Sequence, residues 1–369
     1  MVAVAVFLTP ASATAQAANA RTLVSATPIA GAPAGALAYR IVYRSMTGRG
    51  GQAEATGIVI VPAGAEPRAG RDIVAWTHGT TGIADACAPS ANSWRLSIIA
   101  GLAPMIQQGY IVVAPDYLGL GSAGTHPFLV GADTAHAVLD AVRAARDVRR
   151  GRTTGRFALW GESQGGHAAL WSGRLARAYA PELRLVGVAA AAPATDLVAN
   201  IAGDGNAAVR ALMTSYAGVS WSQIYGVPLS TVTGPVGQDL MRRLARRCVT
   251  LDGLKLGTKI GLARMIHVLR DVDLAALPRW GELMRSNSVE RVPLGVPLLI
   301  AQGSADVIIA PSVTRSFATA VCRAGQRIRF IPVAGGDHVT IAKRTSEQTV
   351  EWLRERFAGR TDPSDCATL

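Results

Sequence analysis

Short apolar segments alternate along the chain with longer segments whose apolar residues recur at helical spacing. Short, uninterrupted apolar runs are typical of strands that are buried on both faces of a parallel sheet. Runs of this kind predict strands over residues 58–61, 73–76, 110–114, 156–160, 185–192, 297–301 and 327–332. Helical spacing predicts helices over residues 97–108, 136–149, 166–179 and 349–357. Strands that alternate with helices indicate an α/β fold with a mainly parallel central sheet.

The alternation of strands stops between residues 195 and 295. Gly and Pro punctuate this stretch, and its apolar spacing predicts helices over residues 207–216, 238–247 and 259–270. A separate domain would have the same pattern. We favour a helical cap inserted into one core, because the strand pattern resumes at Pro297. On this interpretation the cap covers residues 195–295, and the core consists of residues 21–194 and 296–369.

The first residues have the pattern of an export signal. An apolar run over residues 2–8 is followed by Ala-x-Ala triplets at 15–17 and 18–20, although no Lys or Arg precedes the run. The run is too short to cross a bilayer. We therefore expect residues 1–20 to be a signal peptide and the mature protein to be secreted, outside the cell or in the cell envelope. No other stretch predicts a transmembrane segment.

Composition and charge narrow the class of protein. Hydrophobic residues make up 49% of the 369 residues and charged residues only 17%, a balance that favours a folded chain with a sizeable core. The formal net charge is +12. The basic residues are scattered, however, and no nucleic-acid-binding motif accompanies them, so we expect no nucleic-acid partner. A weak attraction to anionic interfaces stays open.

The chain has four cysteines, Cys87, Cys248, Cys322 and Cys366. Their wide spacing without a C-x-x-C motif opposes a zinc site. An even number of cysteines in an exported protein favours disulfides, and four allow three pairings. We favour Cys87–Cys248 and Cys322–Cys366, the second of which would tie the C-terminal tail to the segment before the last strand. Four buried free thiols are the alternative.

The segment Gly161-Glu162-Ser163-Gln164-Gly165 has the pattern G-x-S-x-G. In this pattern the serine lies on a sharp, strained turn between a strand and a helix, and the glycines allow both elements to approach closely. A predicted strand precedes the segment and a predicted helix follows it. We therefore predict that Ser163 is a catalytic nucleophile.

A serine hydroxyl needs a base, and in folds with this turn the chain order is Ser, then Asp or Glu, then His. His338 follows a predicted strand on a glycine-rich loop, and Asp306 follows the strand before it. We expect His167 to point away from the nucleophile and His267 to pack on an apolar helix of the cap. The sequence therefore predicts a triad of Ser163, Asp306 and His338.

Acyl transfer also needs two donors for the oxyanion of the tetrahedral intermediate. We expect one to be the backbone N–H of Gln164, directly after the nucleophile. The loop after the strand over residues 73–76 supplies the other, and we favour the backbone N–H of Thr80, with Thr81 as the alternative. We interpret His78 as a side chain that stabilises this loop.

Four segments together carry a family resemblance. They are His78-Gly79-Thr80-Thr81-Gly82, Cys87-Ala88-Pro89-Ser90, Pro115-Asp116-Tyr117-Leu118-Gly119 and Gly161-Glu162-Ser163-Gln164-Gly165-Gly166. This combination resembles the secretory lipase family, from about residue 35 to the C-terminus. The resemblance implies an α/β-hydrolase core, a helical cap over the acyl site and hydrolysis of carboxylic esters, including acylglycerols. It agrees with the predicted triad and with a disulfide from Cys87.

The chain departs from the family in one loop, because fungal members have an acidic residue where this chain has Gly79-Thr80-Thr81. The departure leaves the second oxyanion donor open and points to smaller, more soluble esters. We interpret Asp116 and Tyr117 as groups that order a neighbouring loop.

We therefore expect a secreted lipase or esterase that forms an acyl-enzyme and needs no metal or organic cofactor. Its substrate would be a small-molecule or lipid ester, which a lipid–water interface could present. The alternatives are a serine peptidase or an exported acyltransferase with the same triad, and a binding protein with this fold and no catalysis.

Overall fold

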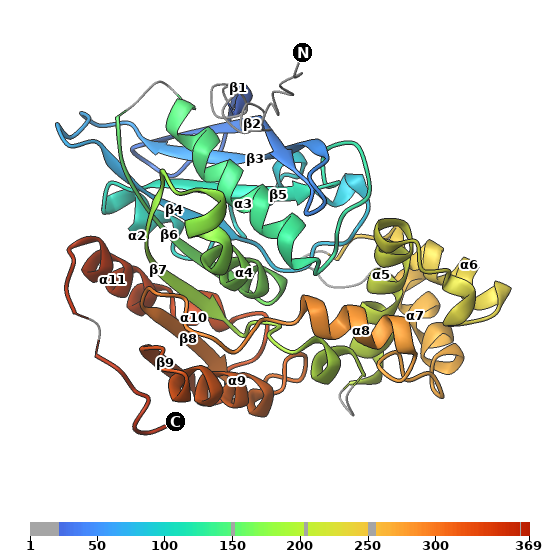
Figure 1. Cartoon of the computed structure of the whole chain (residues 1–369). Helices are drawn as coiled ribbons and strands as arrows, with labels where there is room; N and C mark the ends of the chain where they lie inside the picture. Colours follow the sequence, from blue (N-terminus) through green and yellow to red (C-terminus); the bar gives the residue numbers. More distant parts are fainter. Residues whose placement is uncertain (1–21, 149–151, 203–205, 250–255, 362) are drawn as a thin grey trace, which may run out of the picture.

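A computed structural model describes residues 22–148, 152–202, 206–249, 256–361 and 363–369 (Figure 1). The expected signal peptide, residues 1–20, lies outside the described residues. Within the described part of the chain, no helix is long and apolar enough to cross a membrane.

A nine-stranded sheet forms the centre of the molecule, in the order β1-β2-β3-β5-β4-β6-β7-β8-β9. The pairs from β1 to β5 are antiparallel, and all the pairs from β5 through β4 to β9 are parallel. The strands are β1 (Leu23–Ile29), β2 (Ala36–Met46), β3 (Gln52–Pro62), β4 (Arg71–Thr77), β5 (Ile111–Leu118), β6 (Thr153–Glu162), β7 (Arg184–Ala191), β8 (Leu298–Gly303) and β9 (Ile328–Val333). The predicted α/β fold with a mainly parallel sheet is confirmed.

Burial explains which strands the apolar pattern predicts. Every residue of β5 and of β8 is buried, because helices cover both faces of the parallel part of the sheet. The apolar pattern missed β1 and β2. In β2, buried Ile41 and Tyr43 alternate with the less buried Val42 and the exposed Arg44, so a period of two was the available signal.

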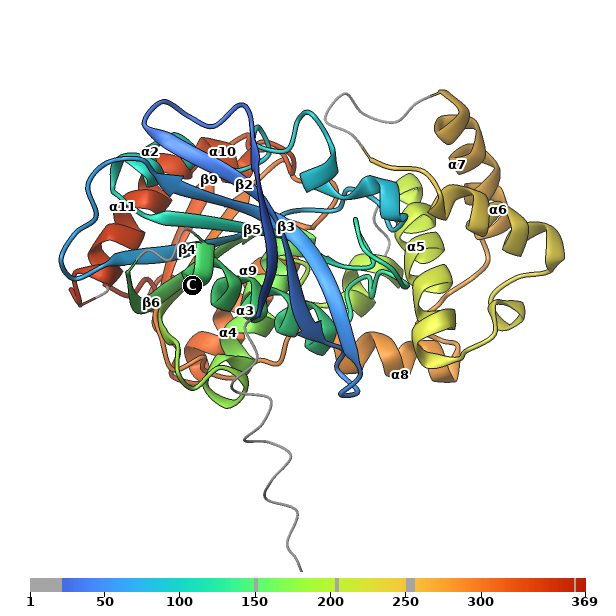
Figure 2. The ribbon, with the colours of Figure 1, turned by 90° about the horizontal axis from the view of Figure 1, so that it is seen from above.

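Helices cover the two faces of the sheet (Figure 2). Buried residues of α3 (Gly131–Asp147), α4 (Gln164–Tyr179) and α9 (Pro311–Arg323) share a core cluster with one face. Buried residues of α2 (Leu102–Gln107), α10 (Ile341–Arg344) and α11 (Ser346–Phe357) share a second cluster with the other. The helix α2 is shorter than predicted, because the missing N–H of Pro104 is tolerated only in the first turn.

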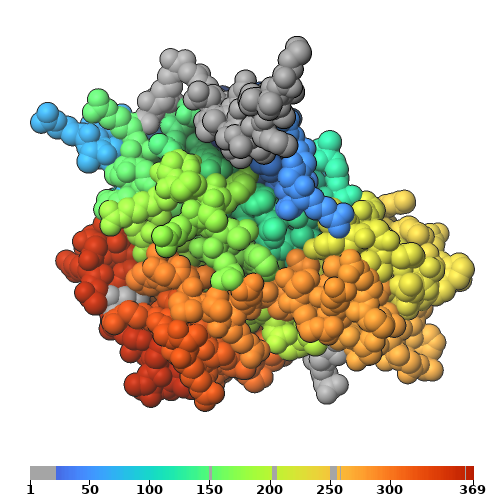
Figure 3. Space-filling model, viewed as in Figure 1, coloured from blue at the N-terminus to red at the C-terminus, as the bar shows by residue number. Residues whose placement is uncertain are grey.

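In the described part of the segment between β7 and β8, four further α-helices are present. They are α5 (Ala207–Tyr225), α6 (Pro235–Ala245), α7 (Leu256–Val268) and α8 (Pro278–Asn287). They pack around a third cluster of buried residues, and in the space-filling view they form a lobe beside the sheet (Figure 3). Phe128 and Ile309 of the core belong to the same cluster, so the lobe packs directly against the loops that follow β5 and β8.

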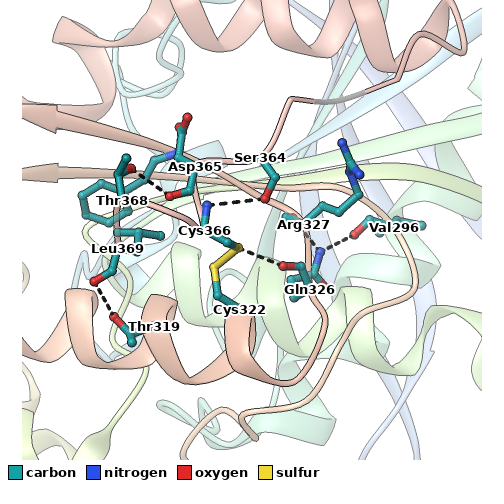
Figure 4. Close-up of a disulfide and its surroundings, with 11 residues drawn as sticks. Val296, Thr319, Cys322, Gln326, Arg327, Ser364, Asp365, Cys366, Thr368 and Leu369 are labelled. Carbon is teal, nitrogen blue, oxygen red and sulfur yellow. Dashed lines mark hydrogen bonds between the residues drawn. A yellow bond between two sulfur atoms is a disulfide. The ribbon is translucent and has the colours of Figure 1, made fainter.

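Both favoured cysteine pairs are disulfides, and none of the four cysteines is free. Cys87–Cys248 joins the loop after β4 to the segment that follows α6, with 5.3 Å between the Cα atoms. Cys322–Cys366 ties the C-terminal tail to α9 (Figure 4). The tail also runs along β9, where the backbone N–H of Asp365 donates to the carbonyl of Ile328 at 2.8 Å.

Candidate active site

Ser163 lies on the turn between β6 and α4 with φ 55° and ψ −120°, a conformation that is strained for a residue with a side chain. The glycines of the motif make the turn sterically feasible. A Cβ atom at Gly161 would lie 2.0 Å from the Thr77 Oγ1 atom, and one at Gly165 would lie 1.9 Å from the Thr77 carbonyl oxygen. Only glycine fits these two positions, because the neighbouring strand β4 approaches so closely.

The structure brings Ser163, His338 and Asp306 together. The Ser163 Oγ atom lies 2.8 Å from the His338 Nε2 atom, and the His338 Nδ1 atom lies 2.8 Å from the Asp306 Oδ2 atom. These distances fit a serine hydroxyl that donates to Nε2 and an imidazole Nδ1–H that donates to the carboxylate. The three residues follow β6, β9 and β8, whose carboxyl ends meet at one edge of the sheet.

The Asp306 carboxylate is held by a set of buried donors. Its Oδ1 atom accepts hydrogen bonds from the backbone N–H groups of residues 308–309, and its Oδ2 atom also accepts one from the Gln302 amide at 3.1 Å. Burial raises the pKa of Asp306, but the hydrogen bonds from His338 and from 308–309 outweigh it and hold the pKa below its ordinary value. Gln302, which Thr314 orients through a 2.7 Å hydrogen bond, was missed by the sequence analysis.

The other two histidines that follow the serine lie apart from the triad. His167 is fully buried, its ring N–H donates to the carbonyl of Asn287, and burial lowers its pKa to about 4. The expectation that His267 packs in the cap is wrong, because its side chain is exposed. On α7 the side chains of Leu262 and Met265 are buried, and position 267 lies on the outer side of the helix.

The expected oxyanion donors lie at the same cavity as the nucleophile. Thr80, Ser163 and Gln164 all line it. Gln164 is the first residue of α4, where the backbone N–H groups of a helix have no partner within the helix. Both residues therefore lie beside Ser163 at the cavity.

Several contacts hold the loop that carries Thr80. The Tyr117 hydroxyl donates to the carbonyl of His78 at 2.9 Å, and the two rings lie 4.5 Å apart. The imidazole Nδ1–H of His78 donates to the carbonyl of Gly79 at 2.6 Å, as its expected loop-stabilising role requires. The backbone N–H of Val249, next to the Cys87–Cys248 disulfide, donates to the carbonyl of Thr81 at 2.8 Å. The lobe and the loop are therefore directly connected.

Asp116 connects two of the sequence motifs. Its buried carboxylate accepts hydrogen bonds from the Thr56 hydroxyl at 2.5 Å and from the backbone N–H of Ser90 at 2.8 Å. Ser90 belongs to the Cys-Ala-Pro-Ser segment, so this hydrogen bond joins the two segments. The loop-ordering role expected for Asp116 agrees with these contacts.

Glu162, directly before the nucleophile, has an unusual environment that the sequence analysis missed. A Cβ atom at Gly79 would lie 3.5 Å from the Glu162 Oε1 atom, so the carboxyl group lies against the loop of Thr80. Within the described residues this carboxyl group has no hydrogen bond or ion pair. Burial raises its pKa to about 7.

A small cavity of about 30 Å³ opens at Ser163. One water molecule needs about 10–15 Å³ on the same measure, so the cavity holds about two groups of that size. Its walls are apolar apart from four residues, Thr80, Ser163, Gln164 and Asn200. In the described part of the chain, no three His, Cys, Asp or Glu side chains are grouped so that they could hold a metal ion.

A family model described as secretory lipase matches residues 97–364. Among relatives, Lipase 5 of Candida albicans is 27% identical over 282 residues, which cover 72% of this chain and 58% of that protein. The chain therefore spans less than two thirds of the length of this relative. A protein of Mycobacterium tuberculosis named probable inactive lipase MT1628 is 24% identical over 344 residues, which cover 88% of this chain and 74% of that protein.

Solved structures show a similar fold. The rice cell wall degrading esterase LipA from Xanthomonas oryzae matches with a TM-score of 0.74 and 21% identity, over 92% of this chain and 99% of that one. Lipase A of Candida antarctica in its closed state matches with a TM-score of 0.65 and 19% identity, over 95% of this chain and 85% of that one. These likenesses show that the chain has the α/β-hydrolase fold.

Proposed function

This chain belongs to the secretory lipase family, and from that premise we propose that it is a secreted carboxylic ester hydrolase with a serine nucleophile. The observation that carries the proposal is the hydrogen-bonded triad of Ser163, His338 and Asp306. The two contacts, from the Ser163 Oγ atom to the His338 Nε2 atom and from the His338 Nδ1 atom to the Asp306 Oδ2 atom, are each 2.8 Å long. Family membership by itself does not carry it, since one relative is named a probable inactive lipase.

The proposed reaction has two acyl-transfer steps. The His338 Nε2 atom takes the proton of the Ser163 hydroxyl while the oxygen attacks the ester carbonyl. The carboxylate of Asp306 stabilises the imidazolium, and the backbone N–H groups of Gln164 and Thr80 bind the oxyanion. The alcohol leaves with the proton from His338. A water molecule, activated in the same way, then hydrolyses the acyl-enzyme and releases the acid.

The proposed substrates are esters with short acyl groups, because the cavity at Ser163 holds only about two groups of the size of water. A lipid–water interface could present them. Val307 follows Asp306 and Val339 follows His338, and their side chains are 67% and 74% exposed. An apolar surface could therefore contact the rim of the site. The two disulfides support a secreted protein, because such bonds persist in oxidising compartments.

The test is hydrolysis of p-nitrophenyl acetate and butyrate by the wild type and by Ser163→Ala. We expect kcat/KM to fall at least about a thousandfold in the variant, with an unchanged circular dichroism spectrum. The matched control is Ser172→Ala, in the same helix, whose hydroxyl is buried and without a partner in the described part of the chain. Turnover retained by Ser163→Ala would overturn the proposal.

Two further measurements separate the alternatives. Esters, amides and alcohol acceptors are assayed side by side, so that a peptidase or an acyltransferase is recognised by its preferred reaction. Labelling with a fluorophosphonate tests the binding-protein alternative. A wild-type protein that neither hydrolyses esters nor reacts with the fluorophosphonate would be a binding protein with this fold.

A further inference from the structure

Asn200 brings an unpaired amide to the cavity at Ser163. Its Oδ1 and Nδ2 atoms are both buried, and neither has a hydrogen-bond partner among the described residues. Asn200 lines the cavity together with Ser163. A buried polar group without a partner costs about 1–3 kcal/mol, so its presence needs an explanation.

The backbone around Asn200 is held without help from the amide. Residues Val198–Ala202 form a π-helical turn, a rare conformation that occurs frequently at functional sites. The backbone N–H of Asn200 donates to the carbonyl of Asp196 at 2.9 Å, and the backbone N–H of Leu197 donates to the Ser288 hydroxyl at 3.0 Å. The turn directs the side chain to the cavity, while the fold makes no use of its polar atoms.

The other polar residues of the cavity have roles in the proposed reaction. Ser163 is the nucleophile, and the backbone groups of Gln164 and Thr80 bind the oxyanion. The remaining walls are apolar and include Leu197, Ile201, Met213, Ile308 and Ile309. The side chain of Gln164 is held on its amide nitrogen, which lies 3.1 Å from the His126 Nε2 atom, and only its Oε1 atom is unpaired among the described residues. Asn200 differs because both polar atoms of its side chain lack a partner there.

The cavity lies on the acyl side of the scissile bond. The oxygen of the leaving alcohol must lie near the His338 Nε2 atom, which delivers its proton. His338 is not among the residues that line the cavity, whereas Gln164 and Thr80 of the proposed oxyanion hole are. A group that occupies the cavity is therefore attached to the carbonyl carbon.

We propose that Asn200 determines specificity by binding a hydroxyl group on the acyl chain, so that the preferred substrates are esters of short hydroxy acids. An amide offers a donor and an acceptor, and a hydroxyl group offers both in return. The described residues that line the cavity include no Lys or Arg to compensate a carboxylate, so a neutral partner fits better. The proposal rests on the proposed ester hydrolysis.

The inference is tested by comparing esters whose acyl chains carry either a hydroxyl group or a methyl group of similar size. A methyl group leaves the amide unpaired in an apolar wall, and sites built to bind a hydroxyl reject the analogue without it. We expect the hydroxy ester to be favoured about tenfold through this contact.

The experiment measures kcat/KM by pH-stat titration for ethyl 3-hydroxybutanoate and ethyl 3-methylbutanoate, and for the matched pairs substituted at carbons 2 and 4. The wild type is compared with Asn200→Leu, so that the intrinsic reactivity of each ester cancels. We expect the hydroxyl-to-methyl ratio to fall about tenfold in the variant for at least one pair. The matched control is Thr195→Val, which removes another buried, unpaired oxygen at a position that does not line the cavity, and it should leave the ratios unchanged.

Ratios that agree within about twofold between the wild type and Asn200→Leu in all three pairs would overturn this inference while leaving ester hydrolysis intact. A wild type that hydrolyses neither ester and resists fluorophosphonate would instead overturn the proposed function, and this inference with it. Thermal unfolding gives a second readout. We expect Asn200→Leu to melt no lower than the wild type, because no hydrogen bond is lost. A lower melting temperature with unchanged ratios would assign Asn200 a structural role.

Discussion

Replacing Glu162 by Gln tests how the site tolerates an unpaired carboxyl group. Burial raises the pKa of Glu162 from its ordinary value of 4.5 to about 7 in the folded protein. The folded state therefore binds more protons than the unfolded state between these values, and the free energy of unfolding falls as the pH rises through this window. Above about pH 7 the wild type carries a half-buried carboxylate without a partner among the described residues, whereas Glu162→Gln stays neutral at every pH.

The size of the effect follows from the two pKa values. The difference between about 7 and 4.5, at about 1.4 kcal/mol for each pH unit, gives a stabilisation of about 3 kcal/mol in Glu162→Gln at pH 8. This is an upper limit, because the side chain is partly accessible to water and solvent screens the charge. At pH 5 the carboxyl group of the wild type is almost wholly protonated in the folded state, and the two proteins should differ by less than about 1 kcal/mol.

The assay is urea unfolding at half-unit steps from pH 5 to pH 8, followed by tryptophan fluorescence. At each pH the free energy of unfolding of the wild type is subtracted from that of the variant, because the titration of all other groups cancels in this difference. Glu182→Gln is the matched control. The hydrogen bond from Arg143 lowers the pKa of Glu182, so this carboxylate stays ionised over the whole range and the control's difference should not change with pH. If the difference in free energy of unfolding between Glu162→Gln and the wild type also stayed constant from pH 5 to pH 8, the raised pKa of Glu162 would be refuted.

Three further changes test the site and its scaffold. Asp306→Asn should lower kcat about 10⁴-fold at pH 7.5 without loss of circular dichroism signal, because the amide no longer favours the productive tautomer of the histidine; a loss below tenfold would count against the triad. Gly165→Ala should lower the free energy of unfolding by more than about 2 kcal/mol, since its Cβ atom would lie 1.9 Å from a carbonyl oxygen. Gly64→Ala, at a position with open space, should change it by less than about 0.5 kcal/mol, and equal effects would contradict the steric argument. The double substitution Cys322→Ala with Cys366→Ala should lower stability by about 4 kcal/mol and leave kcat/KM unchanged, because the disulfide closes a 44-residue loop away from the nucleophile; unchanged urea unfolding would contradict this.

The sequence predicted the central strands and the main helices, since burial on both faces leaves an uninterrupted apolar run. It missed strands whose exposed face is polar, as in β2, and it missed α8 and α9. The error at His267 has a related cause. Apolar neighbours along the chain do not reveal which side of a helix faces its partners, and position 267 faces solvent.

The G-x-S-x-G segment, the chain order and the loops after predicted strands were enough to predict that Ser163, Asp306 and His338 meet, because parallel strands bring their carboxyl ends to one edge of the sheet whatever the length of the connections. Both disulfide pairs were favoured from the sequence as well. The tertiary structure alone decided how individual polar groups are solvated. Glu162 lies unpaired against the loop of Gly79, and Asn200 faces a cavity that Ser163 and Thr80 also line, because of residues that are distant in sequence. Solvation and pairing are properties of those assembled neighbours, and local sequence does not specify which groups will surround a side chain.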